Sequence, residues 1–314
     1  MKKLLALLAT LVFVLVLAAC GGDESENAEN NTGNEGNADS ENNETEEIES
    51  LTMGFIPSQE ADEIADNVEP LEAYLTEELG ITVEAEVMTD FVGLVEGMRT
   101  GQIDIGFINP FGYVQAVDRA NVEIILKSIR YGSDTYVAQY LVPADSELES
   151  VEDIATTEGL SWAYPDILST SGYLFPGAQL MDLGVEDLET FYTQVATGGH
   201  DNAALAVLEG QADFATTFDD ARDTLVEEHP TIMEDLKIIG HTDPIPNDGI
   251  ALRENFPEDL KQKVIDAFMA INDNEEVLAV MNEVYTWDGI AKAQDSDYDV
   301  VRSVYDKFEE QLSE

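Results

Sequence analysis

The feature that most constrains the fold is an alternation of short apolar runs and amphipathic segments, which occurs twice along the chain. Apolar runs of strand length between segments with helical spacing are typical of α/β sheets. We therefore expect an open α/β sheet from each half. The first half is expected to hold strands at 51–57, 81–88 and 103–108 and helices at 68–79 and 91–99. The second half is expected to hold strands at 160–164, 191–195 and 212–216 and helices at 173–183 and 201–209.

Two similar halves predict two lobes joined by two crossing segments. Residues 49–314 are long enough for two separate cores. After the second half, a proline-rich segment precedes two amphipathic helices, expected near 258–272 and 299–312, through which the chain returns to the first lobe. A cleft between such lobes is the natural place for a small ligand. The predicted bounds are 49–137 with 241–314 for lobe 1, 138–240 for lobe 2, and crossings near 136–142 and 238–245.

The first residues predict export. A basic start, Met1 to Lys3, precedes an apolar run that ends in Leu-Ala-Ala before Cys20. A basic region, a short apolar region and small residues before the cleavage point describe a secretory signal. The apolar run is shorter than the roughly 20 residues of a transmembrane helix, the alternative interpretation. We therefore expect residues 1–19 to be a signal peptide.

Cys20 is the only cysteine of the chain, so it has no intramolecular disulfide partner. Its position after Leu-Ala-Ala resembles a bacterial lipobox, in which the cysteine is lipidated; a chance cysteine is the alternative. Residues 21–47 are Asn, Glu, Gly, Asp and Ser with almost nothing apolar, which is typical of disorder. We expect residues 20–48 to be a lipidated tether with a reach of about 30 Å, and the protein to lie on the outer face of the cell membrane.

The charge of the chain is strongly acidic. Sixty-six acidic residues against 14 basic ones give a formal net charge of −52. Such a surface disfavours nucleic acid as a partner. It is typical of a protein from a halophilic host, because the Debye length falls to about 3 Å at 1 M salt and self-repulsion is then screened.

The sharpest local signal is a run of hydroxyl side chains, Ser169, Thr170 and Ser171, directly before Gly172 and an expected helix. Ser and Thr cap helices well, and free backbone N–H groups at a helix start attract anions. The run therefore indicates an anion site, with a solvated capping loop as the alternative. His200 opens the next expected helix and can donate to an anion; a surface histidine is the alternative.

An enzyme is not expected. Ser171, His200 and Asp248 are the residue types of a hydrolase triad, but the Gly-x-Ser-x-Gly elbow is absent. The three histidines have no metal-ligand spacing, and no Gly-x-Gly-x-x-Gly follows an expected strand. We therefore expect no metal and no cofactor.

A series of motifs in order gives a family resemblance. Over about residues 51–270 the chain resembles the phosphate, phosphite and phosphonate substrate-binding proteins of ABC importers. The resemblance implies a type II periplasmic-binding-protein fold whose two lobes close on the ligand. The motifs are 53–58 (MGFIPS), 97–107 (GMRTGQIDIGF), 110–113 (PFGY), 169–173 (STSGY), 199–201 (GHD) and 244–248 (PIPND).

The resemblance also implies roles for individual residues. Ser169, Thr170 and Ser171 would hold the phosphoryl oxygens, and His200 would donate to one of them. Tyr136, at the first crossing, would donate from the opposite wall. Because few Arg or Lys lie near the motifs, we expect the donors to be mostly hydroxyl and backbone groups.

Two acidic residues and two departures bear on the ligand. Asp248 would accept a proton from a protonated oxygen or meet an amino group, and Asp219 lies where some members place an acid for an amine. Phe91 stands where phosphonate binders often have tyrosine, and Asn109 replaces a common glycine. An acid at Asp248 favours a ligand that carries a proton or an amine. We therefore expect a phosphonate or phosphite to be preferred over phosphate.

The expected partners are a small phosphorus oxyanion and the permease of an ABC importer, and the protein is expected to be a monomer. Two alternatives remain open. One is a binding protein of the same fold for another small ligand. The other is a sensory module that presents its ligand to a membrane kinase.

The acidic composition predicts stabilisation by salt. We expect the free energy of unfolding to rise from low to molar NaCl, because screening removes repulsion among carboxylates. Urea unfolding across a salt series measures this. Stability that stays constant or falls toward molar salt would contradict the halophile hypothesis.

Overall fold

The computed structural model describes residues 48–59 and 61–313. The predicted signal peptide, Cys20 and tether residues 20–47 lie outside this part. Within the described part, no helix is long and apolar enough to span a membrane.

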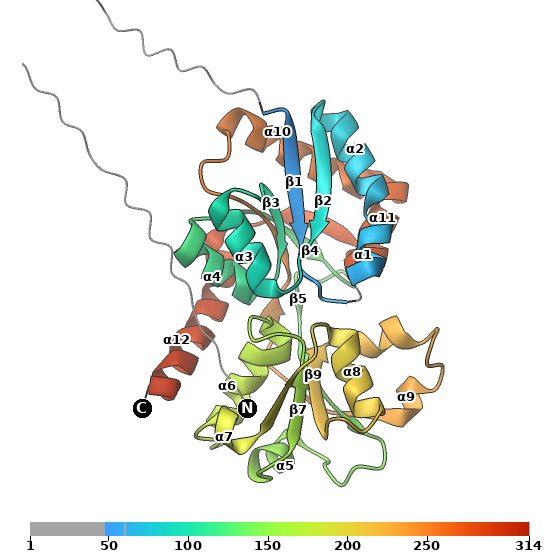
Figure 1. The fold of residues 1–314 in the computed structure, drawn as a ribbon, viewed down its shortest axis with the longest axis vertical. Coiled ribbons are helices and arrows are strands. Elements are labelled where there is room, and N and C mark those ends of the chain that lie inside the picture. Colours follow the sequence, from blue (N-terminus) through green and yellow to red (C-terminus); the bar gives the residue numbers. More distant parts are fainter. Residues whose placement is uncertain (1–47, 60, 314) are drawn as a thin grey trace, which may run out of the picture. The chain divides into compact units, whose positions relative to one another are not determined.

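Lobe 1 contains a six-stranded mixed sheet with the order β13-β4-β12-β3-β1-β2 (Figure 1). β1 pairs in parallel with β2 and β3, whereas β12 is antiparallel to both β3 and β4. The parallel register places Phe55 opposite Phe107, and their rings stack with centroids 4.3 Å apart. The strands are β1 (Ser50–Phe55), β2 (Thr82–Val87), β3 (Ile105–Ile108), β4 (Glu123–Ile129), β12 (Gly249–Leu252) and β13 (Gly289–Lys292).

Helices cover both faces of this sheet (Figure 1). The pair α3 (Phe91–Thr100) and α4 (Pro110–Ala120) packs together on one face. The other face carries α1 (Ala61–Asn67), α2 (Glu69–Leu79), α10 (Glu258–Ala270) and α11 (Glu275–Tyr285).

Lobe 2 contains a five-stranded sheet with the order β10-β6-β9-β7-β8. β7 is parallel to β8 and β9, and β6 is antiparallel to β9 and β10. Its core centres on Trp162, which is fully buried and stacks on Tyr173 and Phe214. The strands are β6 (Ala138–Pro143), β7 (Ser161–Tyr164), β8 (Thr193–Ala196), β9 (Phe214–Phe218) and β10 (Leu236–His241). The helices are α5 (Val151–Thr156), η1 (Thr170–Leu174), α6 (Phe175–Asp182), α7 (Leu188–Phe191), α8 (His200–Leu208), η2 (Ala221–Leu225) and α9 (Ile232–Asp235). The predicted two-lobe α/β fold is confirmed.

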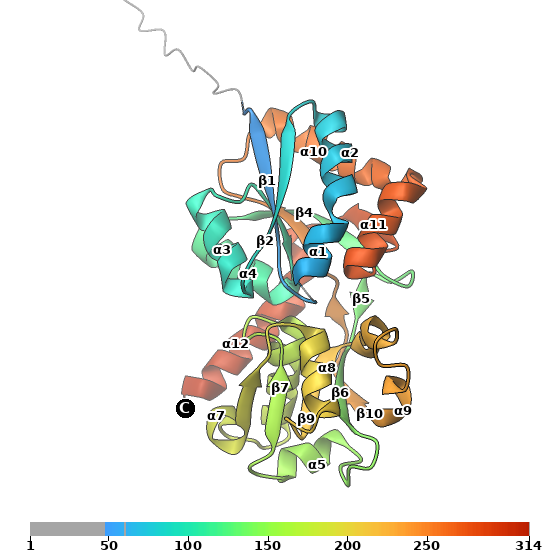
Figure 2. The same ribbon diagram turned by 45° about the vertical axis from the view of Figure 1, so that its right-hand side comes forward.

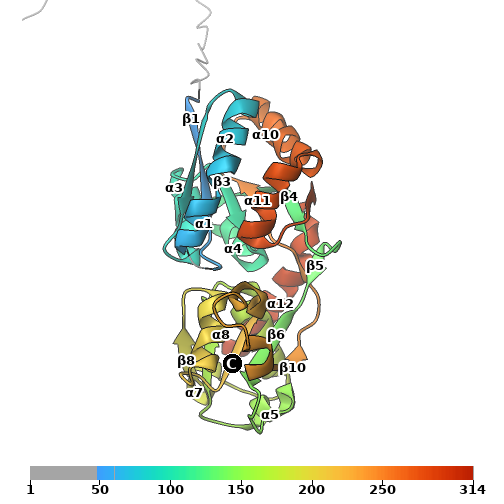
Figure 3. The ribbon, with the colours of Figure 1, turned by 90° about the vertical axis from the view of Figure 1, so that its right-hand side faces the viewer.

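The crossings between the lobes contain two short strands that pair with each other. β5 (Thr135–Tyr136) pairs antiparallel with β11 (Ile245–Pro246) on the path between the lobes (Figure 3). Most of the residues expected in the crossings belong to β6 and β10 instead, because an apolar run looks the same whether it crosses between sheets or joins one. The predicted lobe bounds, 49–137 with 241–314 and 138–240, stay a prediction.

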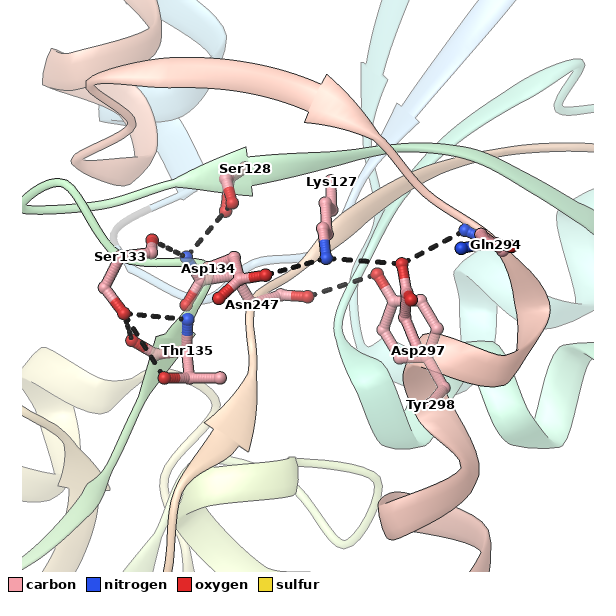
Figure 4. A network of polar contacts seen from close by, with 9 residues as sticks. All are labelled: Lys127, Ser128, Ser133, Asp134, Thr135, Asn247, Gln294, Asp297 and Tyr298. Atoms are coloured by element: carbon pink, nitrogen blue, oxygen red, sulfur yellow. Dashed lines mark hydrogen bonds and ion pairs between the residues drawn. The ribbon is translucent and has the colours of Figure 1, made fainter.

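A polar network fixes the crossing to lobe 1 (Figure 4). Lys127 Nζ pairs with the carboxylates of Asp134, at 2.9 Å, and Asp297, at 3.3 Å. The buried Asn247 donates through Nδ2 to the carbonyls of Ser128, at 3.1 Å, and Ser133, at 2.8 Å. These bonds hold both crossing segments against the C-terminal end of β4.

The C-terminal helix α12 (Asp299–Ser313) contacts both lobes. It packs on α4 of lobe 1 and on α6 of lobe 2 (Figures 1 and 2). In lobe 2, Lys307 Nζ lies 2.5 Å from a carboxylate oxygen of Asp182. Phe308 lies so close to Gly177 that a Cβ there would come within 2.9 Å of its ring. The helix α12 therefore connects the two lobes beside the crossing strands β5 and β11.

The hinge network predicts the effect of Asn247→Ala. The truncation leaves the carbonyls of Ser128 and Ser133 without their amide donor, so we expect the free energy of unfolding to fall by about 2 kcal/mol. Urea unfolding measures this. Asn282→Ala, which removes an exposed bond to Asp288, is the matched control and is expected to change stability by less than about 0.5 kcal/mol. Equal effects of the two substitutions would contradict the role of the network.

Candidate functional site

A small cavity lies between the lobes, at the edge where several strands end. Its volume is about 30 Å³, which is room for about two or three waters. A ligand of a few non-hydrogen atoms therefore suits it. Lobe 1 contributes Ile56, Ser58, Gln59, Phe91, Asn109, Arg130, Asp248 and Tyr285, β5 contributes Tyr136, and lobe 2 contributes Ser169, Thr170, Ser171, His200 and Phe218.

The topology explains why these residues meet. In lobe 1, Asn109 follows β3, Arg130 follows β4, and Asp248 precedes the antiparallel β12, so all three lie at one edge of the sheet. In lobe 2, the hydroxyl turn follows β7, His200 follows β8, and Phe218 ends β9. Ligands of open α/β sheets bind at the carboxyl ends of the strands.

The hydroxyl turn is held by capping and by close packing. Ser169 caps the single helical turn η1, since its Oγ accepts from the Gly172 N–H at 3.0 Å. A Cβ at Gly172 would lie 2.3 Å from Cδ of Pro165, so no larger residue fits there. All three hydroxyl residues of the turn are at least 98% buried.

Thr170 joins the two lobes. Its Oγ1 accepts from Asn109 Nδ2 and from the Phe111 N–H, both at 2.9 Å. Asn109 Nδ2 also donates to the carbonyl of Leu168 at 2.7 Å. Asn109, the departure from the family's glycine, therefore makes direct bonds between the lobes.

His200 is a neutral donor in this geometry. Its Nδ1 accepts from the Phe218 N–H at 3.3 Å, so the ring proton belongs on Nε2, which lies 3.4 Å from Ser169 Oγ. Burial, with a smaller effect from Arg130, lowers the pKa of His200 to about 3. The backbone N–H of His200 donates to the Ser58 carbonyl at 2.9 Å, a second bond between the lobes.

Asp248 and Tyr136 form the opposite wall. Burial raises the pKa of Asp248 to about 6, and the charge of Arg130 opposes that rise. Burial and the charge of Asp248 raise the pKa of Tyr136, while hydrogen bonds with Ser171 and Thr170 oppose the rise. Tyr136 therefore keeps its proton and can donate it, whereas Asp248 can exchange a proton near neutral pH.

Arg130 is the residue that the sequence prediction missed. It is only 7% exposed, and its guanidinium lies over the rings of Phe218, at 4.9 Å, and Tyr136, at 5.7 Å. Arg130 Nε is buried without a hydrogen-bond partner among the described residues. The donors expected from the sequence are mostly neutral, and Arg130 adds a charged one that lies outside every motif.

Asp219 does not line the cavity. It lines an adjoining groove that shares Arg130 and Tyr136 with the cavity. Phe218, its neighbour at the end of β9, faces the cavity, and successive side chains at a strand point to opposite sides. The other predicted ligand residues all line the cavity: Phe91, Tyr136, Ser169, Thr170, Ser171, His200 and Asp248. Within the described residues, no group of three or more His, Cys, Asp or Glu could hold a metal ion.

Comparison with known proteins gives consistent matches. Residues 53–298 match the family model of the periplasmic substrate-binding protein of phosphonate ABC transporters. The phosphonates-binding periplasmic protein of Escherichia coli is 29% identical over 75% of this chain and 70% of its own length. The phosphate-import protein PhnD of Mycolicibacterium smegmatis is 29% identical over 82% of this chain and 85% of its own.

Solved structures have the same fold. A binding-protein component of an ABC phosphonate transporter from Pseudomonas aeruginosa superposes with a TM-score of 0.77 at 26% identity, covering 83% of this chain and 87% of its own. PhnD1 of Prochlorococcus marinus, solved with methylphosphonate, has a TM-score of 0.74 at 18% identity, covering 83% of this chain and 98% of its own.

The raised pKa of Asp248 predicts a pH-dependent effect of Asp248→Asn. The folded protein keeps the proton up to about pH 6, whereas the unfolded chain releases it near pH 4. The wild type therefore loses stability between these values as the pH rises, and the variant does not. We expect the variant to be more stable by about 2 kcal/mol at pH 8 and equally stable at pH 4.

Urea unfolding at pH 4, 6 and 8 and constant salt measures this difference. The exposed Asp306 offers a control, Asp306→Asn. A stability difference for Asp248→Asn that does not change with pH would contradict the assignment.

Proposed function

The chain belongs to the family of periplasmic substrate-binding proteins of phosphonate ABC transporters, and from this we propose that it captures a small phosphorus oxyanion between its lobes, with phosphonate or phosphite preferred over phosphate. It is a binding protein of an importer and not an enzyme. Capture would proceed by closure of the two lobes on the ligand.

The observation that carries the proposal is that both polar and apolar side chains line the cavity. Ser169, Ser171, His200 and Tyr136 offer hydrogen-bond donors, and Asp248 offers an acceptor. A tetrahedral oxyanion with one protonated oxygen matches this set, because it accepts several hydrogen bonds and donates one.

The apolar side chains support the preference against phosphate. Ile56 and Phe91 line the cavity with groups that cannot donate a hydrogen bond. A P–H or P–CH₃ group can lie against these side chains without loss. A fourth oxygen there would be buried without a partner, at a cost of about 1–3 kcal/mol.

The named relatives support the class of ligand. The names of two curated relatives mention phosphonates and phosphate, respectively, and the Prochlorococcus structure contains methylphosphonate. All of these are tetrahedral phosphorus oxyanions. We therefore assign the class from the family and the preference within it from Phe91 and its apolar neighbours.

The remaining parts of the proposal concern the setting of the protein. We propose a monomer, anchored by a lipid on Cys20 to the outer face of the membrane, that delivers its ligand to an ABC permease. The resemblance of residues 17–20 to a lipobox and the polar composition of residues 21–47 support the anchor and its tether.

Calorimetry with phosphate, phosphite and methylphosphonate tests the ligand preference. We expect phosphite or methylphosphonate to bind at least about tenfold more tightly than phosphate, which corresponds to about 1.4 kcal/mol. Sulfate, which carries no proton to donate at neutral pH, is expected to bind more weakly than all three. Phosphate as the tightest ligand would overturn the preference, and no binding of any phosphorus oxyanion would overturn the proposed function.

The variant Ser171→Ala serves to place the ligand in this cavity. We expect it to weaken binding of the best ligand about tenfold or more, the scale of one lost charge-assisted hydrogen bond. Ser303→Ala removes an exposed hydroxyl on α12 and is expected to leave affinity unchanged. Equal affinities of the two variants would place the ligand elsewhere.

A further inference from the structure

Arg130 is an isolated positive charge inside a strongly acidic protein. Only 7% of its surface is exposed, and its Nε has no hydrogen-bond partner within the described residues. None of the ion pairs found in that part of the chain involves it. Burying a charge without a partner is costly. The other buried arginine, Arg222, is paired with Asp220 at 2.6 Å, so the lack of a partner is particular to Arg130.

Aromatic packing holds the guanidinium but does not neutralise it. The group lies over Phe218 and Tyr136, and a cation–π contact contributes about 0.5–2 kcal/mol. An effective penalty of several kcal/mol for a buried ion exceeds this. Both rings line the cavity together with Arg130. No ion pair is found for Arg130 among the described residues, and its buried Nε has no hydrogen-bond partner there, so the group is open to an anion in the cavity.

We propose that Arg130 supplies the positive charge that the bound oxyanion neutralises, and that the same charge excludes ligands with an ammonium group near the phosphorus. The ligands are then phosphorus oxyanions whose fourth substituent is hydrogen or a small uncharged alkyl group. This inference rests on the proposed function and narrows its substrate class.

Arginine suits the first role. The guanidinium stays charged at all physiological pH values and offers several N–H donors in one plane, which match two oxygens of a tetrahedral anion. Its charge acts on both Asp248 and His200, lowering the pKa of each. Arg130 thus lies close enough to influence the acceptor wall and the donor wall of the cavity together.

The exclusion of an ammonium group follows from what surrounds the cavity. Asp219, the carboxylate expected to receive an amine, lines the adjoining groove instead. Asp248 is the one carboxylate among the residues that line the cavity, and Arg130 already acts on its charge. An ammonium group would therefore meet a like charge and the apolar walls formed by Phe91 and Ile56. Like charges at close range in a dry site repel strongly.

A pair of isosteric ligands tests the exclusion on the wild-type protein. Ethylphosphonate and aminomethylphosphonate differ by CH₃ against NH₃⁺ at the same position. We expect calorimetry to give at least a tenfold weaker affinity for aminomethylphosphonate. Equal affinities, tighter binding of the amine, or failure of both ligands to bind would overturn the exclusion by charge, even where phosphite or methylphosphonate binds.

The variant Arg130→Met tests the role of the charge with both ligands. We expect the affinity for ethylphosphonate to fall at least tenfold and the ratio of the two affinities to shrink at least threefold. The ratio compares the same two ligands in two proteins, so their intrinsic differences in protonation cancel. Arg99→Met, which removes an exposed arginine of α3, is the matched control and is expected to change neither quantity.

Thermal unfolding separates this role from a structural one. If Arg130 serves the ligand, ligand-free Arg130→Met unfolds at the wild-type temperature or above it, because the variant no longer buries an unpaired charge. A lower unfolding temperature together with an unchanged affinity ratio would assign Arg130 a structural role and overturn the inference. If the wild type binds phosphite but Arg130→Met binds ethylphosphonate and aminomethylphosphonate as the wild type does, the inference about Arg130 is overturned and the proposed function stands. Absence of any binding by the wild type would overturn the proposed function itself.

Discussion

The hydrogen bonds that Thr170 accepts from lobe 1 are the interaction on which the site depends. Through Asn109 Nδ2 and the Phe111 N–H, they fix the hydroxyl turn of lobe 2 against the start of α4. The cavity exists only where these surfaces meet, because the hydroxyl turn and His200 come from lobe 2 and the two charged residues from lobe 1. The fold places both sets at strand ends, and the hinge network around Asn247 keeps the crossing strands in line.

The electrostatics of the cavity differ from those of the molecule. The chain carries a net charge of −52, yet Arg130 and Asp248 are the charged groups among the cavity's lining residues. Screening in salt weakens repulsion by the distant surface charges, whereas the buried pair is screened far less. Local groups therefore decide which ions the cavity accepts, and the acidic surface bears on solubility and stability.

The local sequence patterns predicted several strands of the two sheets and the turn that carries the hydroxyl residues. β1, β2 and β3 lie within about two residues of the expected strands, and the hydroxyl turn precedes a helix as expected. α4, β4, β12 and α11 have no counterpart among the expected elements. For β12 the reason is that a four-residue strand between β3 and β4 is defined by pairing with distant segments. Arg130 did leave a signal: it shares one strand face with the buried Leu126 and Ser128, which is unusual for an arginine. Whether Asp219 lines the cavity depends on the direction of its side chain at the end of β9, which no sequence motif indicates.

The bonds between the lobes have a consequence for recognition of the loaded protein. Thr170–Asn109, Thr170–Phe111 and His200–Ser58 join protein to protein, so this share of the closing free energy needs no ligand. Preorganisation of this kind raises the affinity for the ligand, but it also raises the fraction of ligand-free molecules that adopt the closed conformation. A transporter that recognised shape alone would then spend ATP on empty carriers. Asn109, which donates to both Thr170 and the Leu168 carbonyl, contributes to this balance between affinity for dilute ligand and ATP used on empty carriers.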